Sequence, residues 1–214
     1  MCTTQELNNK FYLAKLINGI RRESIMKSYN HSIAALLLIA STSASAEQWN
    51  LVFGLSQPLV TKGGNIEINY LTEKFVFEYS HGFALNLSTN KGIGMTGIEK
   101  SQHLDIYVPY STGGGAGYRF TKEFNVRLEI KQHQFNVAHP SGENINYTTR
   151  DIGVGAYYFW LPFNSKYFLI VPSIRYWPTV YSRLKNDEFT FSNGDVHKAH
   201  SFGLFGNVSI GWRF

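Results

Sequence analysis

The last fourteen residues, SFGLFGNVSIGWRF (201–214), decide the fold of this chain. Every second residue in this stretch is apolar or small, namely Phe202, Leu204, Gly206, Val208, Ile210, Trp212 and Phe214. Side chains alternate between the two faces of a strand, so these residues form one continuous apolar face. The opposite face is mostly small and polar. This pattern is typical of a strand with hydrocarbon on one side and a polar lumen on the other.

The terminal aromatic residue is a second signal. Phe214, preceded by Trp212, Ile210 and Val208, resembles the carboxy-terminal signature of Gram-negative outer-membrane barrels, which the barrel-assembly machinery recognises during insertion. The resemblance is to the class of small eight-stranded barrels that includes the OmpA transmembrane domain and OmpX. It implies a monomer in the Gram-negative outer membrane, exported by the Sec route and in contact with outer-membrane lipid and lipopolysaccharide.

The first 46 residues have the pattern of a leader. Lys27 precedes an apolar run at 33–40 and a small-residue run at 41–46, which is the order of a secretory signal peptide. The apolar run is too short to span a bilayer as a helix, which disfavours the alternative of a retained anchor. We expect cleavage after Ala46. Residues 1–25 either lengthen the leader or precede a true start at Met26, and we favour Met26.

Charge and cysteine usage exclude several function classes. Removing residues 1–46 leaves 15 of the 20 Lys and Arg residues and 13 of the 15 Asp and Glu residues, so the remaining chain is only mildly basic. No cluster of basic residues with interleaved aromatics indicates a nucleic-acid partner. The single cysteine, Cys2, lies in the leader, which excludes a disulfide, a thiolate nucleophile or a Cys-ligated metal in the rest of the chain.

Residues 47–214 are expected to form eight strands joined by three short turns and four longer loops. A weak repeat of aromatics around a few polar residues marks the turns, at 70–75, 118–124 and 158–167, and the longer polar stretches are 57–64, 86–102, 138–146 and 183–196. The expected strands are 48–56, 65–71, 75–85, 104–120, 124–136, 147–160, 167–181 and 197–214. We therefore expect an all-β fold, an antiparallel up-and-down transmembrane barrel with both ends and the short turns on the periplasmic side.

Alternation along each strand predicts which side chains face lipid. The fifth strand is the clearest, with Phe124, Val126, Leu128 and Ile130 outward and Asn125, Arg127, Glu129 and Lys131 inward. On 75–85 the outward set is Phe75, Phe77, Tyr79, Phe83 and Leu85, with Val76, Glu78, Ser80, Gly82 and Ala84 inward. The other outward residues are Ile66, Ile68, Tyr70, Ile106, Val108, Tyr110, Ala116, Phe120, Ile152, Val154, Tyr158, Trp160, Phe168, Ile170 and Ile174. A soluble barrel or sandwich with these stripes in its core is the alternative, but it would expose the charged stripe of the fifth strand.

Aromatic residues and prolines add local expectations. A lower aromatic belt at the periplasmic strand ends is predicted from Trp49, Tyr70, Phe75, Phe120, Phe124, Trp160, Phe168, Trp212 and Phe214. Pro109 and Pro172 lack the N–H that a sheet needs, so a bulge or kink is expected at each. The glycine-rich run 113–117 lacks the Lys-Ser/Thr of a phosphate-binding loop, and we expect it to accommodate a crowded lumen or a tight curve of the barrel.

Parity places nine charged residues, four acids and five bases, inside the barrel. They are Glu67, Glu78, Arg119, Arg127, Glu129, Lys131, Asp151, Arg175 and Arg213. The interior of an eight-stranded barrel is just wide enough for side chains to fill, so this near-balance predicts a salt-bridged plug. The functional alternative is a narrow channel for small solutes.

Candidate catalytic and metal sites are weak. The histidines at 81, 103, 133, 139, 197 and 200 lack metal-site spacing, since His197 and His200 would fall on opposite faces of a strand, and we expect hydrated histidines, no cofactor and no metal. Some small outer-membrane barrels are lipid A deacylases or palmitoyltransferases, and such a deacylase carries His-x-Ser on one strand. Here Ser80–His81 and His200–Ser201 are adjacent pairs on opposite faces, which disfavours a lipid A-modifying enzyme. By class resemblance we expect no enzyme but a structural, surface-display or adhesion role through the four outer loops.

Overall fold

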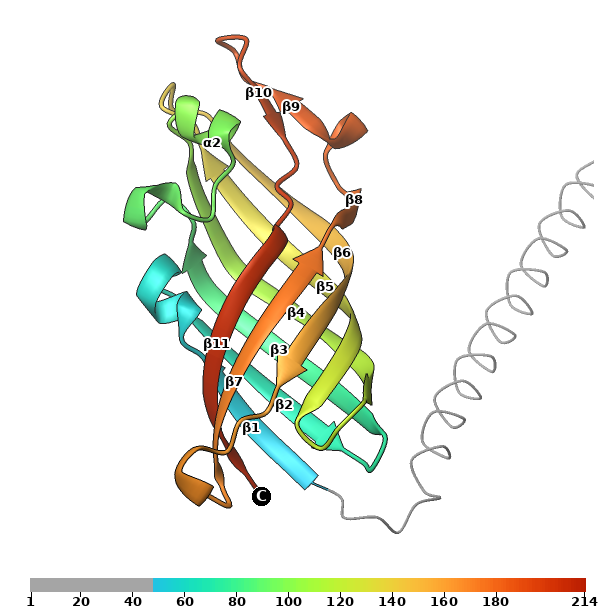
Figure 1. Cartoon of the computed structure of the whole chain (residues 1–214). Helices are drawn as coiled ribbons and strands as arrows, with labels where there is room; N and C mark the ends of the chain where they lie inside the picture. Colours follow the sequence, from blue (N-terminus) through green and yellow to red (C-terminus); the bar gives the residue numbers. More distant parts are fainter. Residues whose placement is uncertain (1–47) are drawn as a thin grey trace, which may run out of the picture. The chain divides into compact units, whose positions relative to one another are not determined.

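The computed structural model describes residues 48–214, so the expected signal peptide, its cleavage after Ala46 and a start at Met26 lie outside the described residues. Within this range the chain forms a closed antiparallel barrel (Figure 1). Its eight wall strands are β1 (Gln48–Gly54), β2 (Gly64–Leu71), β3 (Phe75–Asn86), β4 (Asp105–Arg119), β5 (Phe124–Ala138), β6 (Asn144–Tyr158), β7 (Phe168–Trp177) and β11 (Gly203–Arg213). Pairing of β1 with β11 closes the ring. The expected eight-stranded antiparallel barrel is confirmed.

The two ends of the barrel differ. We call the end with the short connections 72–74, 120–123 and 159–167 the turn end; the last connection holds η3 (Pro162–Asn164). The opposite, loop end carries the remaining elements: η1 (Gln57–Thr61), η2 (Asn90–Gly92), α2 (Gly97–Ser101), β8 (Thr179–Ser182), η4 (Lys185–Asp187), β9 (Glu188–Thr190) and β10 (Val196–Lys198). Of these, α2, β9 and β10 lie above the wall in Figure 1. β8 continues β7 beyond Pro178 and pairs with β6. None of the helices within 48–214 is long and apolar enough to cross a membrane.

One expected loop is shorter than predicted. The stretch 138–146 was predicted as a long polar loop, but β5 runs to Ala138 and β6 starts at Asn144, in register, so only 139–143 connect them. The strands extend because their inward side chains at this level, Phe135 and Tyr147 among them, pack into an apolar cluster. Two of the polar residues that suggested a loop, Asn144 and Asn146, lie on the outer face of this hairpin.

The turn-end half of the outer wall is apolar. Outward side chains such as Leu128, Ile130, Val154 and Ile174 are each exposed by two fifths or more. The nine aromatic residues expected in a lower belt all lie at the turn end, where Trp49 contacts Tyr70 and Phe168 contacts Trp212 with ring centroids 4.9 and 5.5 Å apart. A continuous apolar surface therefore surrounds this half of the barrel.

Three residues expected to face lipid point inward instead. Leu85, Ile106 and Val108 are buried in the lumen, at 7%, 0% and 0% exposure. The cause is a bulge at Pro109: the β4–β5 register shifts between Tyr107 and Ser111, so one extra residue on β4 reverses the parity beyond it. On the facing strand β3, Ala84 adopts φ +53° and turns outward, where parity had placed it inside.

The bulge expected at Pro109 is thus present. At Pro172 no extra residue is inserted, but the pairing of β7 with β6 ends next to it, at Ser173. There β7 keeps its register with β11 without a shift. The expected outward position of Phe202 is also wrong. β11 begins at Gly203, whose φ of +58° reverses the direction of the preceding side chain, and Phe202 packs inward against the His133 ring at 4.8 Å between centroids.

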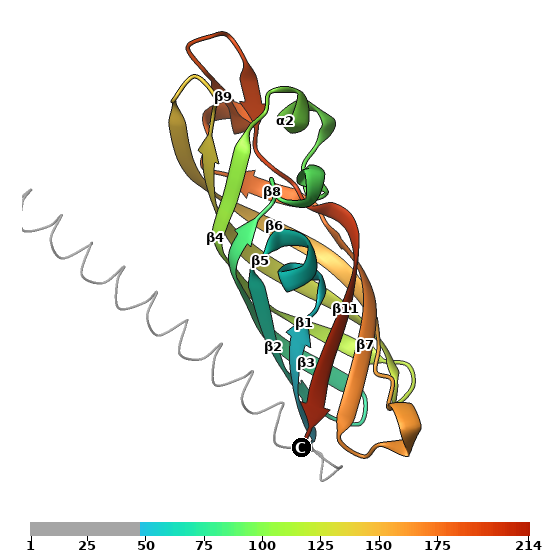
Figure 2. The same cartoon turned by 90° about the vertical axis from the view of Figure 1, so that its left-hand side faces the viewer.

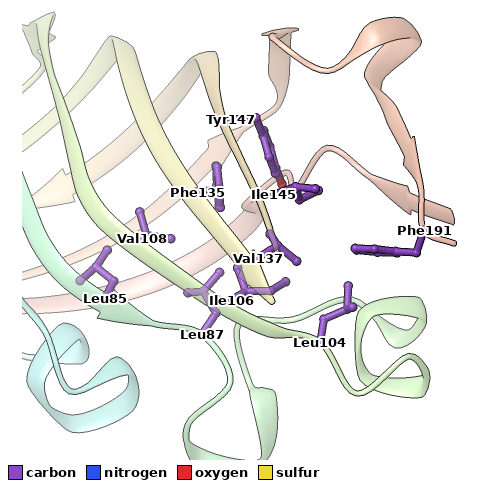
Figure 3. Close-up of a cluster of buried hydrophobic side chains, with 10 residues drawn as sticks. All are labelled: Leu85, Leu87, Leu104, Ile106, Val108, Phe135, Val137, Ile145, Tyr147 and Phe191. Atoms are coloured by element: carbon purple, nitrogen blue, oxygen red, sulfur yellow. The ribbon is translucent and has the colours of Figure 1, made fainter. Parts of the chain in front are cut away.

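The lumen is apolar at both ends. At the turn end a cluster forms from Val52, Leu71, Val76, Tyr157, Phe159, Leu169 and Val171. At the loop end a larger cluster, drawn in Figure 3, joins inward side chains of β3 to β6 with loop residues: Leu85, Leu87, Leu104, Ile106, Val108, Phe135, Val137, Ile145, Tyr147 and Phe191. The polar lumen predicted from the sequence is therefore confined to the middle of the barrel.

Candidate functional site: the lumen network and the outer latch

The middle of the lumen holds a network of buried charges centred on Arg127. This side chain projects inward from β5 and is 1% exposed. Its Nη1 donates to Glu67 Oε1 at 2.7 Å and to Glu78 Oε2 at 2.6 Å, and its Nε donates to Asn125 Oδ1 at 2.8 Å. The guanidinium also lies over the Tyr157 ring, 3.7 Å from its centroid. One cation therefore joins acids from two neighbouring strands, β2 and β3.

Each of these acids has a second basic partner. Glu78 also pairs with Lys131, whose Nζ donates to Ser80 Oγ at 2.6 Å. Glu67 also pairs with Arg175 of β7, at 3.2 Å between Nη2 and Oε2. Bases and acids thus alternate across the lumen, which is how buried charges avoid an uncompensated desolvation cost.

Two further acids are held mainly by neutral donors. Glu129 accepts hydrogen bonds from the Tyr157 hydroxyl and from the Trp177 indole nitrogen. Asp151 accepts one from Thr179 at 2.9 Å and lies 3.4 Å from His133 Nε2. We call Glu67, Glu78, Arg127, Glu129, Lys131, Asp151 and Arg175 the lumen network.

The other two charges expected in the lumen lie outside this network. Arg119 and Arg213 sit at the turn end, and the Arg119 guanidinium donates to the backbone carbonyls of Thr72 and Lys122. The alternation of side chains predicted the correct face of the wall for both residues, but not their position along the barrel axis. Arg119 is the last residue of β4, and Arg213 is the last residue of β11. The interior therefore holds four acids and three bases of the predicted nine.

Glycines on both neighbouring strands make room for the charges of β5. Gly117, Gly115 and Gly113 of β4 lie directly opposite Arg127, Glu129 and Lys131. A Cβ on Gly117 would approach the Val126 carbonyl oxygen to 2.3 Å and the Arg127 Cγ to 2.8 Å. The expectation that this run accommodates a crowded lumen fits this geometry.

At the loop end, a second polar cluster fastens two loops together. Glu99 of α2 lies 2.9 Å from His200 Nδ1, and it also accepts a bond from the Thr96 backbone in a capping box at the start of the helix. The Tyr147 hydroxyl accepts a bond from the His200 backbone N–H at 3.0 Å and contacts His197 Nε2 at 2.9 Å. We call Glu99, Tyr147, His197 and His200 the outer latch.

The latch groups are buried, and the pKa values of Glu99, Tyr147 and His197 are shifted. Burial raises the pKa of Glu99, but the hydrogen bond and charge of His200 and the bonds from Thr96 outweigh it, so this pKa lies below its ordinary value. Burial raises the pKa of the Tyr147 hydroxyl and lowers the pKa of His197. The latch is therefore held by an ionised carboxylate.

The sequence interpretation missed this latch. Four histidines expected to be hydrated, at 133, 139, 197 and 200, are buried, and only His81 and His103 have the exposure expected of all six. The partners lie 50 and about 100 residues apart in the sequence, so no local pattern reveals them. The one usable signal was Thr96-x-x-Glu99, the sequence signature of a capping box.

The candidate catalytic pairs are split as their adjacency implied. Ser80 points into the lumen, where Lys131 binds it, while His81 lies on the outer face; His200 is buried and Ser201 is exposed. Within residues 48–214 no group of three or more His, Cys, Asp or Glu side chains is arranged to hold a metal ion. The residues expected from the sequence to form an assembly signal, Val208, Ile210, Trp212 and Phe214, all lie on the outer face of β11 or directly after it.

No protein-family model matches this sequence, and a comparison with curated proteins finds no match. Among solved structures, the chain is similar to Ail of Yersinia pestis in complex with sucrose octasulfate, at 14% identity and a TM-score of 0.40 over 78% of this chain and 99% of Ail. It is also similar to the N-terminal barrel domain of Pseudomonas aeruginosa OprF (13% identity, TM-score 0.39, 79% and 98% covered) and to Neisserial surface protein A (12%, 0.36, 78% and 92%).

Proposed function

We propose that residues 47–214 form an integral outer-membrane barrel with a plugged lumen, which displays a rigid, folded surface outside the cell. The observation that carries this proposal is the apolar outer wall. Leu128, Ile130, Ile152 and Val154 are register neighbours on β5 and β6 and are all exposed, so their side chains form one contiguous patch. Soluble monomers rarely expose large contiguous apolar patches, whereas hydrocarbon solvates such a patch without cost.

The wall also has a level boundary. On β5 the outward residues are apolar up to Ile130 and polar from Gln132 on; on β6 they are apolar up to Ile152 and polar at Arg150. Ile130 pairs with Ile152, and Gln132 pairs with Arg150, so the change occurs at the same height on both strands. A boundary shared by neighbouring strands is expected where a membrane surface meets water. The hairpin above it then projects into the medium.

The lumen network supports a plug and not a channel. Its three bases are paired with Glu67 and Glu78, Glu129 and Asp151 are hydrogen-bonded by neutral donors, and apolar clusters lie between this network and both ends. An ion would have to displace paired, buried charges to pass. We expect no stable conductance in planar bilayers. Large, long-lived open channels from the purified protein would contradict the plug. As a control for membrane insertion, the vesicle-bound protein should resist extraction with carbonate.

The loop end supports a display role, because the outer latch and its neighbours give it a fixed shape. Exposed apolar side chains such as Ile98, on α2, remain available on this surface. We expect a photo-crosslinker placed at Ile98 in intact cells to capture a defined envelope, host-surface or phage component, while the same group at Lys122, at the turn end, does not. Identical crosslinking patterns from both sites would count against display on the outer side.

Assembly provides an independent test of the location. By class resemblance Phe214, which is 72% exposed beyond the end of β11, is the signal for the barrel-assembly machinery. We expect its deletion to reduce the amount of protein in the outer membrane, with Lys122→Ala as a control for a neutral change. Unchanged outer-membrane levels of the truncated protein would remove this part of the proposal.

A further inference from the structure

A cavity of about 420 Å³ lies in the loop-end half of the barrel wall. It is bounded by β11 at Leu204 and Gly206, by β3 at Ser80 and Gly82, and by the loops that contain η1 and η2. The cavity exists because β1 is short. Its register with β11 ends at Gly54 opposite Ser209, while β11 begins at Gly203, so η1 lies where the wall strand would continue (Figure 2).

The lining is amphipathic. Leu85, Leu87, Met95 and Phe202 are among the apolar lining residues, and Ser80, Ser111, Asn65, Gln57 and Thr61 are among the polar ones.

Two basic side chains face this cavity, Arg175 and His200, and His200 is already paired with Glu99 of the outer latch. Among the residues that line it, Arg175 is the sole Lys or Arg, and none is acidic. Arg175 is 4% exposed and directs Nη2 to Glu67 and Nε to Ser173, and no partner of its Nη1 is found in the described part of the chain. A guanidinium with donors to spare, at the buried end of an apolar cavity, suits a carboxylate or phosphate.

The rim of the cavity is apolar and exposed. Leu204, Ile93 and Leu59 are 69%, 66% and 73% exposed, and the first two line the cavity. Leu204 lies on the outer face of β11, in register through Tyr176 with Val154 of the apolar wall, so at the proposed membrane location an acyl chain that leaves the cavity beside Leu204 would enter hydrocarbon. A ligand that is polar throughout would gain nothing from such a rim.

We propose that this cavity binds a single-chain amphiphile with an anionic head group, such as a fatty acid, with the head group at Arg175 and the chain directed toward the seam between β11 and η1. The orientation of the ligand's acyl chain toward lipid rests on the proposed membrane location. The presence of the cavity and of Arg175 in it does not depend on that location. The lumen network keeps its pairing, since Glu67 also binds Arg127 at 2.7 Å.

Trp177 allows a direct test because it lines the cavity and is 7% exposed. The other tryptophans, Trp49, Trp160 and Trp212, lie on the outer face and are replaced by Phe. The purified protein, in nanodiscs of unbrominated lipid, is titrated with 2-bromododecanoate, a quencher of tryptophan fluorescence whose bromine lies next to the carboxylate and so near Trp177, whose ring centroid is 5.5 Å from Arg175 Cζ. We expect saturable quenching of Trp177 that dodecanoate reverses, and at least tenfold weaker competition by dodecanol and by dodecyltrimethylammonium. Equal competition by the three would overturn the anionic specificity, and quenching that never saturates would overturn the site.

A blocking variant ties the signal to the cavity. Gly82 lines the cavity, and a Cβ there would have contacts no closer than 3.5 Å, so Gly82→Leu should fold and fill the space. We expect it to weaken the quenching at least tenfold, while Gly97→Leu, on α2 with nothing within 4 Å of its Cβ, leaves it unchanged. Equal quenching in the two variants would refute the proposal. Co-elution with nanodiscs reports the membrane location separately, so failure of one idea is distinguishable from failure of the other.

Discussion

Replacing Arg127 by Met removes the centre of the lumen network while keeping a side chain of similar length. Glu67 and Glu78 lose their shared partner, and the Asn125 side chain loses a donor that lies 2.8 Å away. Removing one partner of a buried ion pair costs about 3–5 kcal/mol. We expect a value near the lower limit, since Glu67 retains Arg175 and Glu78 retains Lys131.

The measurement is equilibrium unfolding in urea of the protein folded into phospholipid vesicles, followed by tryptophan fluorescence. Arg150→Met is the matched control, because Arg150 is exposed and its one ring contact, with Tyr181, is at 5.6 Å; it should change the free energy of unfolding by less than about 0.5 kcal/mol. Adding Glu78→Gln to Arg127→Met should cost less than the two single changes together, by about 0.5–3 kcal/mol. If Arg127→Met is no more destabilising than Arg150→Met, the network does not stabilise the barrel and the reasoning is wrong.

Three further outcomes are expected. Val208→Arg, on the outer face of β11, should lower the free energy of unfolding in vesicles by about 2–4 kcal/mol if it lies near the bilayer midplane, and a cost no greater than that of Val208→Leu would contradict the outward assignment. Gly115→Val should cost about 1–3 kcal/mol in the same assay, because its Cβ would come within 2.8 Å of the Leu128 carbonyl oxygen; a neutral result would show that the lumen yields more readily than the close contacts imply. For the outer latch, a lowered pKa of Glu99 means that its stabilisation is complete above the ordinary value of 4.5 and is lost as the pH falls through the lower folded value. Hydrogen exchange of α2, corrected for intrinsic rates, should therefore accelerate in acid below pH 4.5, and Glu99→Gln should already exchange fast at neutral pH; pH-independent protection in the unmodified chain would rule the latch out.

The parts of the fold that the sequence predicted well share one property, an unbroken ladder. Along β5, from Phe124 to Lys131, apolar side chains alternate with polar or charged ones without interruption. Their exposure and burial in the structure follow this alternation residue by residue. The same holds for β11 from Leu204 to Phe214. Period-two reasoning needs only that each residue advance the strand by one position, and at the turn end each residue does.

Depth and distant pairing could not be predicted in this way. Parity gives the face of Arg119 and Arg213 but not their height along the axis, and only height separates the plug from the turn end. For His197 and His200, the partners come from β6 and α2, far away in the sequence. Their burial follows from loops folding onto one another, which a strand pattern does not describe.

The misassigned residues of β4 show how one strand crosses the boundary between hydrocarbon and water. β5 and β6 cross the boundary by changing residue type: their outward face turns polar and their inward face turns apolar, as at Phe135 and Tyr147. β4 keeps apolar residues at alternate positions, Ile106, Val108 and Tyr110, and changes parity instead. The bulge at Pro109 leaves Tyr110 on the outer wall and turns Val108 and Ile106 into the loop-end cluster. Without the extra residue, Ile106 and Val108 would face water above the boundary. The bulge therefore makes the alternating pattern fail as a prediction, and it also allows β4 to contribute side chains to the loop-end cluster.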